Sequence, residues 1–135
     1  YGLVGSEMCI RDRVKMKSDS LISSFKYAIE GIKKACKAER NLKVHTLSML
    51  LVVILGFILK LAVWEWVVCI VLFALVIGAE LFNTSIEEVV NLLSPEIRIH
   101  AKYAKDIAAG AVLVNAFFAA VIGCIIFIPK IIALF

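Results

Sequence analysis

The sequence predicts an all-α integral membrane protein, in which an N-terminal amphipathic surface helix precedes three transmembrane helices. Of its 135 residues, 62% are hydrophobic and 19% are charged, whereas a typical soluble domain is about half apolar. A chain of this length cannot bury such a surplus in one core, and its mean hydropathy of +0.97 agrees with membrane insertion. The composition excludes a secreted disulfide scaffold, a disordered chain and a nucleic-acid-binding module.

Three long apolar stretches lie between His45 and Ile128 and predict three membrane spans. A helix needs roughly 20 residues to cross the hydrocarbon core, so we expect the two shorter stretches to continue into their flanks. The predicted spans are about 45–62, 64–92 and 105–128.

The positive charges predict the topology. Ten of the fifteen Lys and Arg residues lie at or before Lys43, and three more lie between Glu96 and Asp106. Because cytoplasmic segments carry an excess of Lys and Arg, both regions are expected in the cytoplasm, with the C-terminus on the other side.

The N-terminal region divides into two parts. Residues 1–13 show no helical period and are expected to be a non-native extension, which leaves 14–135 as a single membrane domain. From Ser18, apolar residues such as Leu21, Phe25 and Ile29 recur at helical spacing between lysines, which predicts an amphipathic helix at about 18–37 on the membrane surface. This helix serves either as an anchor alone or also in substrate entry.

A stripe of polar residues follows the second apolar stretch. Glu80, Asn83, Glu87 and Asn91 fall on one face of a helix that turns by about 100° per residue. A carboxylate at membrane depth is costly unless paired, so Glu80 is the leading candidate for a functional residue. Glu88 lies off the stripe and is expected to be a solvated acid at a helix end.

Two further polar clusters flank the first and third spans. Glu39-Arg40-Asn41, with His45 nearby, precedes the first span, and Lys105-Asp106 opens the third, followed by the small residues 108–111. Each has an ordinary alternative, since Glu39 can pair with Lys43 and Lys105 can extend to the interface. Their shared position at one membrane face predicts a composite site of carboxylates, an amide and a lysine, which suits Mg²⁺, a phosphate and a proton acceptor.

Asn115, deeper in the third span, is expected to bond to a neighbouring helix. No P-loop or glycine-rich nucleotide loop occurs in the sequence. Phosphoryl transfer by this chain would therefore depend on side chains and metal.

Three segments together resemble the small prokaryotic diacylglycerol kinase family: GAELFNTSIEEVVN at 78–91, SPE at 94–96 and AKDIAAGAVL at 104–113. The ERN-x-x-x-H element at 39–45 resembles the Gram-positive branch, whose members phosphorylate undecaprenol. The resemblance implies a homotrimer in the bacterial inner membrane that transfers the γ-phosphoryl group of ATP·Mg²⁺ to a lipid hydroxyl.

The resemblance also implies roles for individual residues. Glu80 would be the catalytic base, Asn83 would orient the base or the phosphoryl group, and Glu39 and Glu87 would bind Mg²⁺. The implied nucleotide contacts are Tyr27, Glu39, Glu87, Glu96, Arg98, Lys105 and Asp106, and the implied lipid contacts are Glu80, Asn41 and Ala109. The chain departs from the family pattern at Asn91, where many members have Asp, and at Ile97-Arg98, where an aromatic–His pair is more usual.

The acceptor expected from the sequence is undecaprenol, with diacylglycerol as the alternative. The apolar face of the N-terminal helix offers few polar partners for the ester groups of diacylglycerol. A more distant alternative is a non-enzymatic transporter subunit, which would need polar residues through the whole membrane depth. Between Lys60 and Glu80 the only charge is Glu65, which is expected at the membrane interface.

Overall fold

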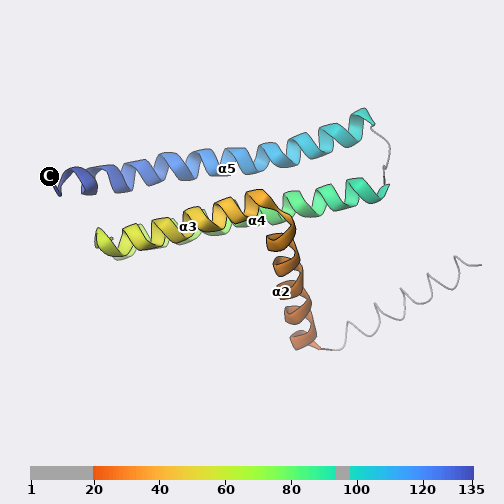
Figure 1. The fold of residues 1–135 in the computed structure, drawn as a ribbon, viewed down its shortest axis with the longest axis horizontal. Helices are drawn as coiled ribbons and strands as arrows, with labels where there is room; N and C mark the ends of the chain where they lie inside the picture. Colours follow the sequence, from red (N-terminus) through yellow and green to blue (C-terminus); the bar gives the residue numbers. More distant parts are fainter. Residues whose placement is uncertain (1–19, 94–97) are drawn as a thin grey trace, which may run out of the picture. The chain divides into compact units, whose positions relative to one another are not determined.

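A computed structural model describes residues 20–93 and 98–135, and every regular element in these ranges is a helix (Figure 1). Three of the helices are long and apolar enough to cross a membrane, which confirms the predicted all-α class with three helices able to span it. The expected extension at 1–13 and the candidate residue Glu96 lie outside the described residues. The helices are α2 (Leu21–Ala38), α3 (Arg40–Ile58), α4 (Val63–Leu93) and α5 (Ile99–Ile132).

Most of helix α2, up to Ala35, belongs to a different compact unit from the bundle. Its apolar residues Leu21, Ile22, Phe25 and Ile29 are exposed, and Lys37 in its last turn lies where a positive charge favours the helix dipole. The location of α2 on the membrane surface stays a prediction.

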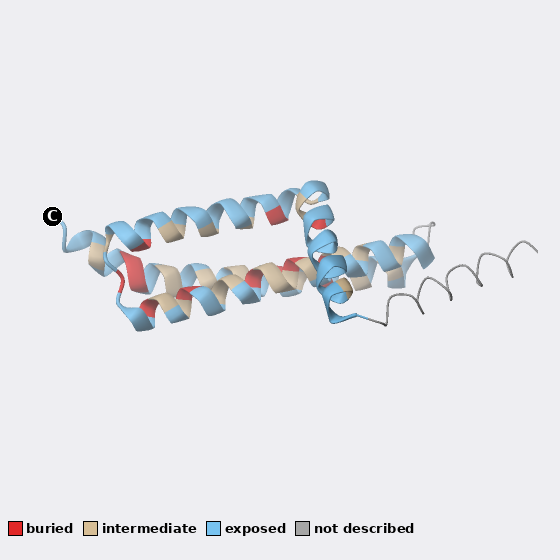
Figure 2. Cartoon of the chain, turned by 90° about the horizontal axis from the view of Figure 1, so that it is seen from below, coloured by how far each residue is buried: buried red, intermediate tan, exposed pale blue. Residues whose placement is uncertain are grey.

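Helix α4 organises the bundle because it packs against both α3 and α5. Few residues of the three helices are buried, and most of their large apolar side chains, including Leu50, Leu75 and Phe117, are exposed (Figure 2). An apolar exterior of this kind is typical of helices whose solvent is lipid, since hydrocarbon tails are as apolar as leucine. The arrangement is that of a membrane bundle.

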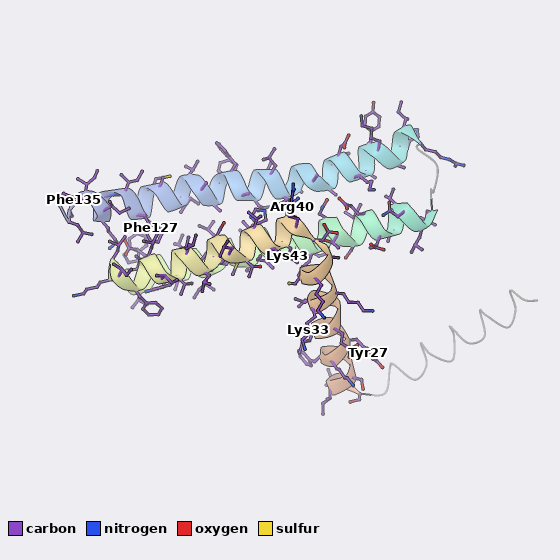
Figure 3. All side chains as sticks on the ribbon, viewed as in Figure 1. Tyr27, Lys33, Arg40, Lys43, Phe127 and Phe135 are labelled. Atoms are coloured by element: carbon purple, nitrogen blue, oxygen red, sulfur yellow. The ribbon has the colours of Figure 1, made fainter. Side chains whose placement is uncertain are left out.

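The short connection between α3 and α4 closes one end of the bundle. Lys60 adopts a positive φ of 51°, and the Leu61 amide donates a hydrogen bond of 3.0 Å to the Gly56 carbonyl. This is the left-handed termination common at helix C-termini. Leu61 then packs with Cys69, Ile126 and Phe127 in an apolar core cluster; Figure 3 labels Phe127 on α5.

A buried ion pair ties the same end of α4 to the end of α5. The Glu65 Oε2 atom accepts hydrogen bonds from the Ala62 amide at 2.6 Å and from Lys130 Nζ at 2.9 Å. Helix α5 continues through Pro129 to Ile132, past the predicted limit of about 128, and so carries Lys130 to this contact. Glu65 is therefore buried and paired, and its position at the membrane interface stays a prediction. The sequence gives no sign that two residues 65 positions apart meet in space.

The contact between Gly56 and Trp66 predicts a specific stability effect. A Cβ atom at Gly56 would lie 2.7 Å from Cη2 of Trp66, so Gly56→Ala should destabilise the bundle by about 1–3 kcal/mol through overpacking. Thermal unfolding of the purified protein in detergent measures this as a lower Tm.

The matched control is Gly78→Ala, because nothing lies within 4 Å of a Cβ atom at Gly78. That variant should keep the wild-type Tm, and Trp66→Leu should relieve much of the loss in Gly56→Ala. Equal Tm values for Gly56→Ala and Gly78→Ala would contradict the predicted clash.

Candidate functional site

A small cavity of about 250 Å³ is lined by residues from all three helices of the bundle, with its polar side chains on α3 and α4. Helix α3 contributes Asn41 and His45, α4 contributes Glu80 and Asn83, and α5 contributes Ala109 to its wall. The folded chain thus brings together four residues expected at the site, Asn41, Glu80, Asn83 and Ala109, from three separate segments.

Glu80 is the most deeply placed acid of the site and is only 2% exposed. Its Oε1 atom lies 3.3 Å from Nε2 of His45, on the neighbouring helix. The Thr84 hydroxyl donates a hydrogen bond of 3.0 Å to the Glu80 backbone carbonyl. The hydroxyl is therefore not a partner of the Glu80 carboxylate. A carboxylate among apolar helices requires such a partner, because burial removes the water that would otherwise solvate it.

Asn83 lies almost one helical turn beyond Glu80 and is also buried. Its Nδ2 atom donates a 3.4 Å hydrogen bond to Oε1 of Glu87. Its Oδ1 atom is buried and has no hydrogen-bond partner among the described residues. Buried polar atoms are rarely left unpaired in native structures, so this oxygen is available to a ligand.

Glu39 and Glu87 lie close enough to Glu80 for their charges to interact with it. Glu39 is the N-cap residue of α3, and its side chain makes no capping hydrogen bond. Lys43 donates instead to the Lys37 carbonyl at 2.8 Å, so the structure does not form the Glu39–Lys43 pair considered as the ordinary alternative. In 20–93 and 98–135, no Lys or Arg forms an ion pair with any of these three acids.

The donor set fits Mg²⁺ better than a transition metal. The described part of the chain holds no cluster of three or more His, Cys, Asp or Glu arranged to hold a metal ion. Mg²⁺ does not need one, because it is commonly held by one or two carboxylates together with substrate phosphates. The acids Glu39 and Glu87 and the unpartnered Oδ1 of Asn83 are the hard oxygen donors that this ion prefers.

The polar stripe on α4 becomes more exposed along its length. Glu80 and Asn83 are buried, Glu87 is half-buried and Asn91 is exposed. Lys105 Nζ donates to Asn91 Oδ1 at 2.9 Å and so links the start of α5 to the exposed end of the stripe. Glu88, off the stripe, is exposed, as expected for a solvated acid.

The other nucleotide candidates lie outside the cavity wall. Asp106 is exposed on α5, and Arg98 is the exposed N-cap residue of that helix. Tyr27 lies on α2, in the part of that helix that belongs to the other compact unit (Figure 3). Within one chain the Nδ2 atom of Asn115 donates to the Ala111 carbonyl of its own helix at 2.9 Å, and its bond to another helix stays a prediction. A regular helix offers that carbonyl to a short polar side chain without any second helix.

An apolar groove of about 510 Å³ adjoins the polar cavity, and residues of α3, α4 and α5 line it. His45 and Ala116 line both spaces. The contact of His45 with Glu80 was not predicted from the sequence, because the two residues are far apart in the chain. The available signal was the placement of both ionisable residues within membrane spans, where each needs a partner.

These features define the class of protein: a helical membrane protein with an acidic, partly unsatisfied site inside its bundle. Residues 26–127 match the family model for prokaryotic diacylglycerol kinase. The chain belongs to the prokaryotic diacylglycerol kinase family.

Two curated proteins are similar in sequence to this chain over most of their length. The undecaprenol kinase of Bacillus subtilis (strain 168) is 40% identical over 107 residues, which cover 79% of this chain and 87% of that protein. The diacylglycerol kinase of Synechocystis sp. (strain ATCC 27184 / PCC 6803 / Kazusa) is 33% identical over 131 residues, which cover 96% of this chain and 75% of that protein.

Proposed function

We propose that this protein is an ATP- and Mg²⁺-dependent kinase that phosphorylates the primary hydroxyl of undecaprenol. The single observation that carries this proposal is the buried Glu80 carboxylate, which lines a polar cavity adjoining an apolar groove. A lipid acceptor needs such a boundary, because its hydroxyl is polar and its chain is hydrocarbon. Because the chain belongs to a lipid kinase family, the reaction proposed for this site is phosphoryl transfer to a lipid hydroxyl.

In the proposed reaction, Glu80 accepts the proton of the lipid hydroxyl. As the lipid oxygen forms its bond to the γ-phosphorus, the bond from that phosphorus to the β–γ bridging oxygen breaks and ADP leaves with the electron pair. A primary alcohol is too weak an acid to ionise beforehand, so a carboxylate placed next to it lowers the barrier. Asn83, less than one turn away, would orient the phosphoryl group.

Glu39 and Glu87 would hold Mg²⁺ in this proposal, with Asn83 Oδ1 as a further oxygen donor. When bound with ATP, the ion would offset negative charge on the phosphates. The absence of a Lys or Arg partner for Glu39 and Glu87 among the described residues supports the assignment, because acids near one another repel unless a cation offsets their charge.

The remaining nucleotide contacts are assigned to Tyr27, Glu96, Arg98, Lys105 and Asp106. Lys105 is the strongest of these, since its ammonium group already lies at the exposed end of the polar stripe, bonded to Asn91. Exchange of that amide for a phosphate oxygen would give a charge-assisted hydrogen bond, which is the stronger interaction.

Undecaprenol is proposed as the acceptor ahead of diacylglycerol. The groove next to the site is lined mainly by apolar residues, which suits a polyprenol that carries a single hydroxyl. The higher identity to an undecaprenol kinase, 40% against 33% for a diacylglycerol kinase, points the same way. Diacylglycerol is the second candidate because a catalytic base does not distinguish two primary alcohols.

The proposed setting is the bacterial inner membrane, with a cytoplasmic N-terminus and a homotrimeric assembly. The concentration of Lys and Arg before the first span supports this orientation. It places the exposed end of the α4 stripe on the side where ATP is available. Lipid and nucleotide would then reach the same carboxylate from the membrane and from water.

Replacement of Glu80 by Gln tests the proposed base. Gln keeps the size of the side chain but cannot accept the proton, so kcat should fall on the order of 10²-fold or more while ATP binding is retained. Turnover of ATP with undecaprenol in lipid–detergent micelles measures the loss. Glu88→Gln is the matched control and should keep wild-type kcat, because Glu88 is exposed and off the stripe. Wild-type turnover in Glu80→Gln would remove this residue from the mechanism.

The metal assignment predicts a change in Mg²⁺ dependence. Glu39→Gln and Glu87→Gln should each raise the Mg²⁺ concentration needed for half-maximal activity, because each loses one anionic oxygen donor. The double variant should lose less than the sum of the two single effects, since residues that share one ligand are not independent. An unchanged Mg²⁺ titration in both single variants would contradict the assignment.

The acceptor preference is tested with both lipids in one detergent system. We expect kcat/KM to be higher for undecaprenol than for diacylglycerol, because an apolar groove offers no partners for the ester carbonyls. A higher kcat/KM for diacylglycerol would reverse the assignment and leave the lipid kinase reaction in place.

A further inference from the structure

The Glu80 carboxylate has one side-chain hydrogen-bond partner in the described part of the chain, and that partner is His45. Nε2 of His45 lies 3.3 Å from Oε1 of Glu80. The two side chains come from different helices, α3 and α4, which pack against each other. The position of the carboxylate therefore depends on a residue outside its own helix.

A glutamate needs this kind of support if it is to act as a base. Its side chain has three rotatable bonds and two equivalent oxygens, so an unsupported carboxylate samples several orientations. Proton transfer requires the accepting oxygen within hydrogen-bond reach of the hydroxyl. The neighbouring Thr84 gives no such support, because its hydroxyl bonds to the backbone carbonyl of Glu80.

We propose that His45 is the positioning residue of the catalytic base: its Nε2–H group holds Oε1 of Glu80 so that Oε2 receives the proton of the lipid hydroxyl. This inference rests on the proposed function of Glu80. His45 keeps its own proton throughout, and no bond to it forms or breaks. Its contribution is to hold the carboxylate in one orientation.

The surroundings of His45 fit this role. Its side chain is 24% exposed against 3% for that of Glu80, and it lines both the polar cavity and the apolar groove. A neutral imidazole donates one hydrogen bond and packs beside hydrocarbon at a lower cost than a Lys or Arg, whose charge is expensive within a membrane. His45 thus supplies a fixed donor at the boundary between the two spaces.

Three substitutions at this position separate orientation from bulk. His45→Ala removes the donor, while His45→Gln carries an amide N–H that extends about as far as Nε2. His45→Asn carries the same amide on a shorter side chain. We expect kcat to fall on the order of 10-fold or more in the Ala and Asn variants, with KM for ATP and lipid changed less than about threefold. His45→Gln should recover most of the lost kcat.

Thr46→Ala serves as a control on the same helix, because the Thr46 hydroxyl bonds to the Leu42 carbonyl of its own helix and Thr46 lines neither the polar cavity nor the apolar groove. It should keep wild-type kcat and KM. Circular dichroism and Tm establish that each variant is folded. If His45→Ala does not fold, the comparison of Gln with Asn still decides the matter, since both preserve an amide and differ only in reach.

A second measurement asks whether His45 acts through Glu80. In the Glu80→Gln background, His45→Ala should cause little further loss of kcat, because the base that it positions is already gone. Equal kcat values in the Gln, Asn and Ala variants would overturn the inference, as would a loss confined to KM or a full additional loss in the Glu80→Gln background.

Failure of this inference is distinguishable from failure of the proposed function. If Glu80→Gln is inactive and His45→Ala keeps wild-type kcat, Glu80 remains the base and His45 has no positioning role. If Glu80→Gln is fully active, the assignment of the base itself is wrong.

Discussion

The burial of one carboxylate, that of Glu80, is the constraint on which the site and the helix packing depend. An acid among apolar helices is costly unless it is paired, and here its pairing residue comes from the next helix. Because each residue advances a helix by about 100°, a rotation of α4 by a single position would carry Glu80 away from His45. The requirement for a partner therefore ties the rotational setting of α4 to α3, and the cavity follows from that setting.

The two ends of the bundle use charge in different ways. At the end formed by the α3–α4 connection, Oε2 of Glu65 is paired with Lys130 and with the Ala62 amide. At the site, Glu80 has a histidine contact, and the Asn83 oxygen has no partner among the described residues. A buried charge with a partner stabilises a structure, whereas a buried polar atom without a hydrogen-bond partner remains available to a ligand. The Glu65–Lys130 pair therefore holds α4 and α5 together, whereas the site around Glu80 and Asn83 has polar atoms that can bind a ligand.

The exposure of the α4 stripe follows a gradient that suits a reaction between a membrane lipid and a soluble donor. Glu80 and Asn83 are buried, Glu87 is half-buried and Asn91 is exposed. Along one helix face, the polar groups therefore run from the side of the apolar groove to the exposed end of the stripe. A site built at this boundary lets the acceptor remain in the bilayer while the nucleotide remains in solution.

The sequence by itself determined the helical class, the three spans and the polar face of α4, because hydropathy and helical period are local properties of the chain. It also singled out Glu80, since an acid after a long apolar run is rare. Only the tertiary structure decided which side chains meet. The His45–Glu80 contact, the Glu65–Lys130 ion pair and the joining of a polar cavity to an apolar groove all depend on the rotation and depth of one helix against another. These settings arise from packing between distant segments, which no local pattern encodes.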